Sequence, residues 1–152
     1  MQTWDAITSR RNVRSYAGRP IHEDDLDRIL EAGRRAPSSQ NWQPWDFVLV
    51  TEREQLRELA KVWRGAGHVA GSAATIVVVG PASDNPFRRA QLDLGQATMA
   101  MMIAAADLGI GSYPARWVQI ASSRSSDAAM SPAQMAPLSM SSRSSSGAAE
   151  QS

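Results

Sequence analysis

The sequence predicts one domain in which helices and strands alternate, and three apolar segments carry this prediction. Phe47–Val50 and Thr75–Val79 are short apolar runs without polar alternation, which is typical of strands buried on both faces. Phe87–Leu108 is long, rich in Ala, Met and Leu, and free of Pro after its start, which indicates a helix of several turns. Two further helical patterns precede the first strand and another lies between the strands.

Both helices before the first strand have recognisable ends. Thr3 is suited to cap a short helix over residues 3–10. The second helix opens in the acidic segment 21–25, because Asp and Glu favour the first turn of a helix, and Pro37 stops it. Its apolar positions recur at helical spacing: Leu26, Ile29, Leu30 and Gly33.

The central segment reads as strand, helix and strand. The first strand covers residues 46–51 and the second covers residues 75–79, closed by Gly80 and Pro81. Between them an amphipathic helix is expected to end at Gly65. Its apolar side chains are Leu56, Leu59, Ala60 and Trp63.

The long helix over residues 87–108 is expected to be buried almost all round. One face carries mainly apolar side chains, and the opposite face is mostly Ala and Met. Small residues would let a second helix approach closely, as a subunit interface requires. The first face comprises Leu92, Gln96, Met99, Met102, Ile103 and Ala106.

Composition excludes several classes of protein. The chain has 152 residues, a net charge of +1 and 43% hydrophobic residues, as in an ordinary globular domain, so no nucleic-acid or membrane partner is expected. It contains no cysteine, which rules out disulfides and thiolate metal sites. The longest apolar run, 97–106, is too short to span a bilayer, and no secretory signal is evident at the amino terminus. A cytoplasmic location is therefore expected.

The composition changes near Tyr113. From Ser122 onward the chain is mainly Ser, Ala, Met and Pro with scattered Arg, and no run of it can bury enough apolar surface to offset the entropy of ordering. We predict a folded domain over residues 1–115 and a disordered tail over residues 116–152.

Other site motifs are absent or lack their structural context. Residues 65–70 match the dinucleotide fingerprint Gly-x-Gly-x-x-Ala, but a helix precedes them and a strand follows, so they are interpreted as a connection. With only His22 and His68 and no cysteine, no metal site is predicted.

An arginine cluster near the amino terminus could bind a phosphate dianion. Guanidinium groups bind phosphate through paired, charge-assisted hydrogen bonds, and Arg10 and Arg14 bracket Asn12 at a spacing that lets both point the same way. The alternative is a solvated basic helix end that interacts with the helix dipole, and taken alone this alternative is favoured.

The polar loop between Pro37 and Pro44 is more specific. Serine, asparagine and glutamine side chains offer donors and acceptors at close intervals, and the two prolines restrict the chain. A flavin ring needs this mixture of polar and apolar contacts. Function is favoured for Asn41 and the serines, whereas Trp45 is interpreted as a core residue.

Together these motifs resemble the nitroreductase family of flavin-dependent oxidoreductases. The resemblance covers residues 3–115 and rests on Arg-Arg-Asn-Val-Arg-Ser-Tyr at 10–16, on the segment 32–47, and on the long helix with the glycine turn 109–112. It implies an α+β fold, an α/β/α sandwich built as an obligate homodimer, with FMN held at the interface by both chains.

The resemblance also implies which residues contact the cofactor. Arg10, Asn12 and Arg14, together with Arg11, would contact the phosphate and ribityl chain. Ser38, Ser39 and Asn41 would line the ring, the serines serving the partner's flavin, and Gly109, Ile110 and Gly111 would approach the ring. NAD(P)H would donate hydride to the flavin, and a nitroaromatic or quinone would accept it. No catalytic acid or base is assigned.

The region after Ser112 departs from the family pattern. No further amphipathic helix, strand with a Gly-Tyr turn or late basic residue is recognisable there, so the carboxyl-terminal portion is expected to be incomplete. Two functions therefore stay open. One is an active FMN enzyme, and the other is a catalytically silent family member that retains at most flavin-binding or interaction capacity.

Overall fold

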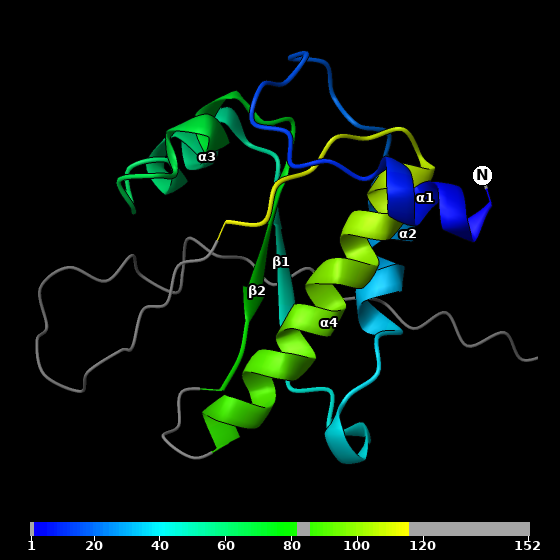
Figure 1. Cartoon of the computed structure of the whole chain (residues 1–152). Helices are drawn as coiled ribbons and strands as arrows, with labels where there is room; N and C mark the ends of the chain where they lie inside the picture. Colours follow the sequence, from blue (N-terminus) through cyan, green and yellow to red (C-terminus); the bar gives the residue numbers. More distant parts are fainter. Residues whose placement is uncertain (1, 82–85, 116–152) are drawn as a thin grey trace, which may run out of the picture. The chain divides into compact units, whose positions relative to one another are not determined.

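A computed structural model of the chain describes residues 2–81 and 86–115, all within one compact unit, Met1–Ser122 (Figure 1). The predicted tail over residues 116–152 and the incomplete carboxyl-terminal portion lie outside the described residues. The mixed α+β fold is confirmed. Its elements, in order, are α1 (Thr3–Ser9), α2 (Glu23–Arg34), the 3₁₀ turn η1 (Ser39–Asn41), β1 (Asp46–Val50), α3 (Arg53–Leu59), the 3₁₀ turn η2 (Gly67–Gly71), β2 (Thr75–Val79) and α4 (Pro86–Asp107).

The two strands form an antiparallel pair whose faces meet different helices. Phe47 lies opposite Val78, and Val48 lies opposite Val77. Because side chains alternate along a strand, Phe47 and Val78 pack toward α2 and α4, whereas Val48 and Val77 pack toward α3 and η2. The described part is therefore layered as helices, sheet and helices.

The layer of α2 and α4 is built by a cluster of Ile29, Met101 and Ala105. Gly33 lets the two helices approach, since a Cβ atom at this position would lie 2.8 Å from Cγ of Met101. On the other face of the sheet, the core consists of Val50, Leu56, Ala66 and Val69. Each layer thus has its own core. The strands are covered on both faces, yet Val50 is the only strand residue in the buried class.

Three predicted helix ends were wrong. Thr3 is the first residue of α1 rather than its cap: Gln2 takes the N-cap position and makes no side-chain capping bond. The helix ends at Ser9, not at Arg10. Helix α3 ends at Leu59, so Trp63 lies beyond it and is 42% exposed. By contrast, α2 begins where the acidic segment predicts, with the His22 ring accepting a hydrogen bond from the Asp24 amide.

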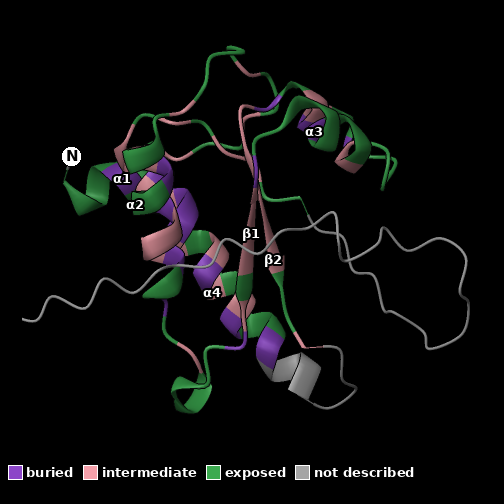
Figure 2. Cartoon of the chain, turned by 180° about the vertical axis from the view of Figure 1, so that it is seen from behind, coloured by how far each residue is buried: buried purple, intermediate pink, exposed green. Residues whose placement is uncertain are grey.

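The predicted all-round burial of α4 was wrong. Its buried side chains belong to a stripe facing the sheet, α1 and α2, whereas Leu92 is 67% exposed and Met99 is 47% exposed (Figure 2). Leu92 and Met99 lie seven residues apart, so both project from the same side of the helix. Met102 of the predicted face is buried instead. One apolar stripe of α4 therefore has no cover from the described residues of its own chain.

No helix in residues 2–81 and 86–115 combines the length and apolar character needed to cross a bilayer.

Candidate functional site

The arginine segment lies beside the glycine turn at the end of α4, although about one hundred residues separate them in sequence (Figure 1). The amide of Val13 donates a hydrogen bond to the carbonyl of Ser112 at 2.9 Å, and Asn12 and Ser112 form a parallel bridge. Two of the three predicted parts of the site are thus brought together within one chain.

The glycine turn is built by the way α4 ends. Gly109 has a φ of 72°, and the amides of Gly109 and Ile110 bond back to the carbonyls of Ala106 and Ala105, as in a Schellman cap. Gly111 then passes so close to the arginine segment that a Cβ atom would lie 3.0 Å from Cβ of Val13. The backbone can therefore approach its neighbour here only because the side chain is missing.

The three arginines of the segment have different partners. Arg10 donates to the side-chain oxygen of Asn12 at 2.9 Å, so these two polar groups lie together. Arg11 donates to the carbonyl of Thr8 and to that of Arg10. Arg11 therefore binds carbonyl groups at the carboxyl end of α1. This is the alternative, helix-end role that the sequence analysis gave for the arginine cluster.

Arg14 is held by an aromatic residue that sequence reasoning missed. Its guanidinium donates to the hydroxyl of Tyr113 and lies 4.2 Å from the centroid of that ring. The His68 ring also contacts Tyr113, with the two rings nearly perpendicular and their centroids 4.8 Å apart. Burial raises the pKa of the nearby Tyr16, and the charge of Arg14 opposes that rise. The available signal was the position of Tyr113, directly after the glycine turn.

The third predicted part, the polar loop, forms a tight turn with unusual backbone angles. Gln40, Asn41 and Gln43 have φ values of 54°, 56° and 51°. Only asparagine among these tolerates the left-handed region readily, so the turn carries backbone strain. Hydrogen bonds within the turn set its shape: the Ser38 hydroxyl accepts a hydrogen bond from the Gln43 amide at 2.8 Å, and the Ser38 carbonyl accepts one from the Asn41 amide. The half-buried Trp45 that follows stacks on Phe47, in line with a core role.

A buried acid on α4 holds this turn. Both carboxyl oxygens of Asp93 accept from the amide of Ser39, each at 3.2 Å, and Asp93 is only 1% exposed. Asp93 and Asp107 are 14 residues apart on α4, a distance of about 21 Å along a helix. The polar turn and the arginine segment therefore lie near opposite ends of α4 (Figure 1). One chain does not bring all three parts together.

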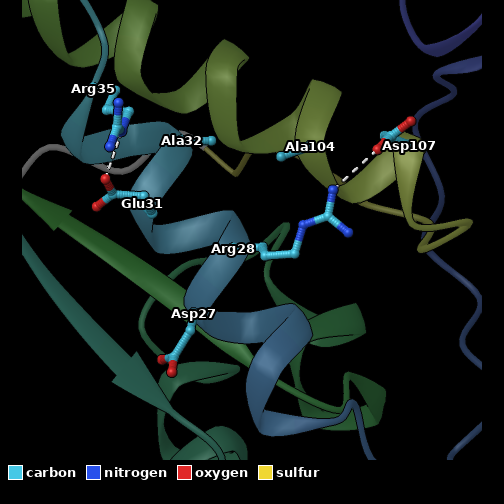
Figure 3. Close-up of a pocket in the computed structure, with 7 residues that line it drawn as sticks. All are labelled: Asp27, Arg28, Glu31, Ala32, Arg35, Ala104 and Asp107. Atoms are coloured by element: carbon cyan, nitrogen blue, oxygen red, sulfur yellow. Dashed lines mark hydrogen bonds and ion pairs between the residues drawn. The ribbon is translucent and has the colours of Figure 1, made fainter. Parts of the chain in front are cut away.

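A separate hollow lies between α2 and α4, and none of the predicted site residues line it. Figure 3 shows Arg28 directed at Asp107 and Arg35 directed at Glu31, so four of its charged groups form two pairs, whereas Asp27 points away from them. Within the part of the chain that the structure describes, no group of three histidine, aspartate or glutamate side chains could hold a metal ion.

Comparison with known proteins agrees with this arrangement. The family model described as the nitroreductase family matches residues 7–80, which include the arginine segment, the polar turn and both strands. The chain belongs to the nitroreductase family. The family resemblance seen in the sequence is thereby confirmed.

The relatives include proteins named as an NAD(P)H nitroreductase and as an FMN reductase. A protein of Archaeoglobus fulgidus, provisionally named NADH dehydrogenase/NAD(P)H nitroreductase, is 36% identical over 108 residues, which are 70% of this chain and 62% of the relative. The FMN reductase [NAD(P)H] of Bacillus subtilis is 33% identical over 60 residues, which are 40% of this chain and 24% of the relative.

A solved structure shows the same fold. A provisionally named nitroreductase from Desulfovibrio desulfuricans, crystallised in complex with FMN, is 30% identical with a TM-score of 0.64, and the match covers 73% of this chain and 66% of that one. The chain covers 62% of the A. fulgidus relative described above, which is less than two thirds of that protein's length.

Proposed function

We propose that this nitroreductase-family chain is one subunit of an FMN-dependent oxidoreductase that takes hydride from NAD(P)H. The observation that carries the proposal is the arginine segment fixed against the glycine turn, where Arg10 bonds to Asn12 and Arg14 bonds to Tyr113. The names of the relatives, an FMN reductase and an NAD(P)H nitroreductase among them, support the same cofactor and electron donor.

The residues present fit a flavin mononucleotide. Two guanidinium groups and an amide suit the phosphate dianion and the hydroxyls of the ribityl chain. Gly109 and Gly111 add no side chain beside that group, and a Cβ atom at Gly111 would make a tight 3.0 Å contact with Val13. Ser38, Ser39 and Asn41 supply the hydrogen-bonding groups that the polar edge of a flavin ring needs.

We further propose that a second copy of the chain completes the site. The uncovered stripe of α4 around Leu92 and Met99 would pack on the same stripe of the partner. If the two α4 helices crossed antiparallel, the amino half of one would lie beside the carboxyl half of the other. The polar turn of each chain would then approach the arginine segment of its partner, which resolves their separation within one chain.

The side chains would bind and orient, and none is required as an acid or base. Bound FMN would supply the redox chemistry, accepting hydride from the nicotinamide and passing it to an electron-poor acceptor of the nitroaromatic or quinone type. Arg10 and Arg14 would neutralise the phosphate, while the polar turn would fix the plane of the ring and exclude water from its polar edge.

Reconstitution tests the function directly. The full chain is purified, mixed with FMN, separated from free flavin, and examined for flavin absorbance and for oxidation of NADH and NADPH with a nitroaromatic or a quinone. We expect a yellow protein that oxidises at least one of the two nicotinamides. A folded protein that retains no FMN would contradict the proposal and favour the catalytically silent alternative.

A further inference from the structure

We propose that Asp93 is a positioning residue that holds the polar turn Ser38–Gln43 in the conformation required for flavin binding. This inference rests on the proposed function, because it assigns the turn to the flavin site. Asp93 itself would not touch the cofactor. It would act through the Ser39 amide.

Burial sets Asp93 apart from the other ionisable residues. Among the described side chains of the buried class, it is the one that can carry a charge; the only other polar member is Ser72. A carboxylate loses its hydration when it is buried, so such a group persists only where hydrogen-bond donors replace water. In this structure the donors are the Ser39 amide at 3.2 Å and the Gln96 side-chain amide at 3.5 Å.

Asp93 is the hydrogen-bonding anchor of the turn within the described residues. Its internal bonds, from the Asn41, Trp42 and Gln43 amides to Ser38 and Ser39, set its curvature but do not fix its place against the rest of the domain. Within the described residues, the hydrogen bonds that tie residues 38–43 to another element are those between Ser39 and Asp93. Three left-handed non-glycine residues follow Ser39 closely, and such strain persists only where surrounding contacts maintain it.

Asp93 therefore couples the orientation of α4 to the orientation of the turn. A dimer formed along the exposed stripe of α4 would use the same helix to place the partner's arginine segment. One rigid element would then set both halves of the shared site.

Two substitutions at Asp93 separate the hydrogen bond from the charge. Asp93→Ala removes every acceptor, whereas Asp93→Asn keeps the size and one acceptor oxygen. Leu56→Ala is the matched control, because Leu56 is fully buried in the opposite core and its truncation destabilises the domain without touching the turn. Hydrogen exchange of the Ser39 amide and FMN affinity by flavin fluorescence are measured for all four proteins under conditions in which each is folded.

In Asp93→Ala we expect the Ser39 amide to lose protection and FMN affinity to fall about tenfold to a hundredfold, the effect of one hydrogen bond to a charged group. Asp93→Asn should retain part of the Ser39 protection and part of the FMN affinity, and its bound flavin should show a shifted visible spectrum. Leu56→Ala should retain the wild-type values. If Asp93→Ala does not fold, Asp93→Asn carries the test.

The inference is overturned if Ser39 stays protected in both Asp93 variants, if FMN affinity is unchanged when protection is lost, or if Leu56→Ala changes both readouts equally. A wild-type protein that binds no FMN would instead defeat the proposed function. Exchange at Ser39 would still decide whether Asp93 holds the turn.

Discussion

The two ends of α4 hold their site residues in opposite ways. At the carboxyl end, the arginine segment presents exposed cations and is fixed by backbone contacts with the glycine turn. At the amino end, the polar turn carries no charge and is fixed by the buried carboxyl group of Asp93. Attraction for an anion is therefore concentrated at the first end, and control of orientation at the second.

This division has a physical reason. Exposed arginine side chains can move to meet a phosphate with their guanidinium groups, and they contribute affinity mainly through charge that salt screens. A flavin ring must instead be held in one plane against its reaction partners, which requires rigid donors and acceptors. Mutations at the carboxyl end of α4 should therefore weaken cofactor binding by removing charge. Mutations at the amino end should weaken it by disturbing the geometry of the polar turn.

The largest effect is expected from removing the cations. Arg10→Ala with Arg14→Ala should weaken FMN binding by about 3–6 kcal/mol, or roughly two to four orders of magnitude in Kd, since each charge-assisted bond contributes about 1.5–3 kcal/mol. Thermal stability should change little, because Arg14 is exposed and neither arginine forms an ion pair with an acidic residue in the described part of the chain. Titration by flavin fluorescence measures Kd, and thermal denaturation measures stability.

The control for this variant removes the same charge elsewhere. Arg57→Ala with Lys61→Ala takes away two surface cations that pair with Glu54 and Glu58, outside residues 10–14 and the glycine turn. The FMN affinity of this control variant should stay near the wild-type value. Equal losses in both double variants would mean that net charge, rather than the arginine segment, attracts the flavin.

Mixed dimers should show whether the two ends act across subunits. Arg10→Ala/Arg14→Ala damages one end, and Ser39→Ala/Asn41→Ala damages the other. If each site takes its arginines from one chain and its turn from the partner, a hybrid dimer contains one intact site. Random mixing of equal amounts should then restore about a quarter of the wild-type flavin, because half of the dimers are hybrids with one of two sites intact. If native mass spectrometry detects hybrids but no flavin binding is recovered, each site takes its arginines and its polar turn from the same chain.

A smaller effect is expected at Tyr113, which supports the charged end. Tyr113→Phe keeps the ring over Arg14 and removes the hydroxyl that accepts its hydrogen bond. FMN affinity should fall about twofold to tenfold, corresponding to about 0.5–1.5 kcal/mol. Tyr16→Phe is the control, since no hydrogen bond joins Tyr16 to Arg14 within the described residues. A rise in affinity in Tyr113→Phe would show that Tyr113 competes with the phosphate for Arg14 instead of positioning it.

Sequence patterns predicted the elements better than their surfaces. The apolar runs 47–50 and 75–79 and the acidic start of α2 were sufficient because each signal is local. The exposed stripe of α4 was not predictable, since an apolar pattern shows that a face will be covered but not whether the cover comes from the same chain. Leu92 and Met99 illustrate this limit.

The site shows the same division between local and long-range information. The contact between residues 12 and 112 could be inferred only from the family resemblance, because nothing in the spacing joins segments so distant. Asp93 did leave a signal that was missed: it is the only charged residue between Ala90 and Ala106. Its partner, the Ser39 amide, carries no sequence signature at all.

The smallest expected effect comes from Glu31, a partly exposed acid on α2 that contrasts with the buried Asp93. Hydrogen bonds from Arg34, then Arg35, lower the pKa of the Glu31 carboxyl from 4.5 to about 2. A lowered pKa in the folded state stabilises the fold above the unfolded pKa, and this contribution is lost as the pH falls from about 4.5 toward 2. The melting temperatures of wild type and Glu31→Gln should therefore differ slightly at neutral pH and converge near pH 2, with high salt also reducing the difference, because exposed pairs are screened. A gap that persists in acid or in high salt would mean that Glu31 contributes through packing at the end of α2 rather than through its charge.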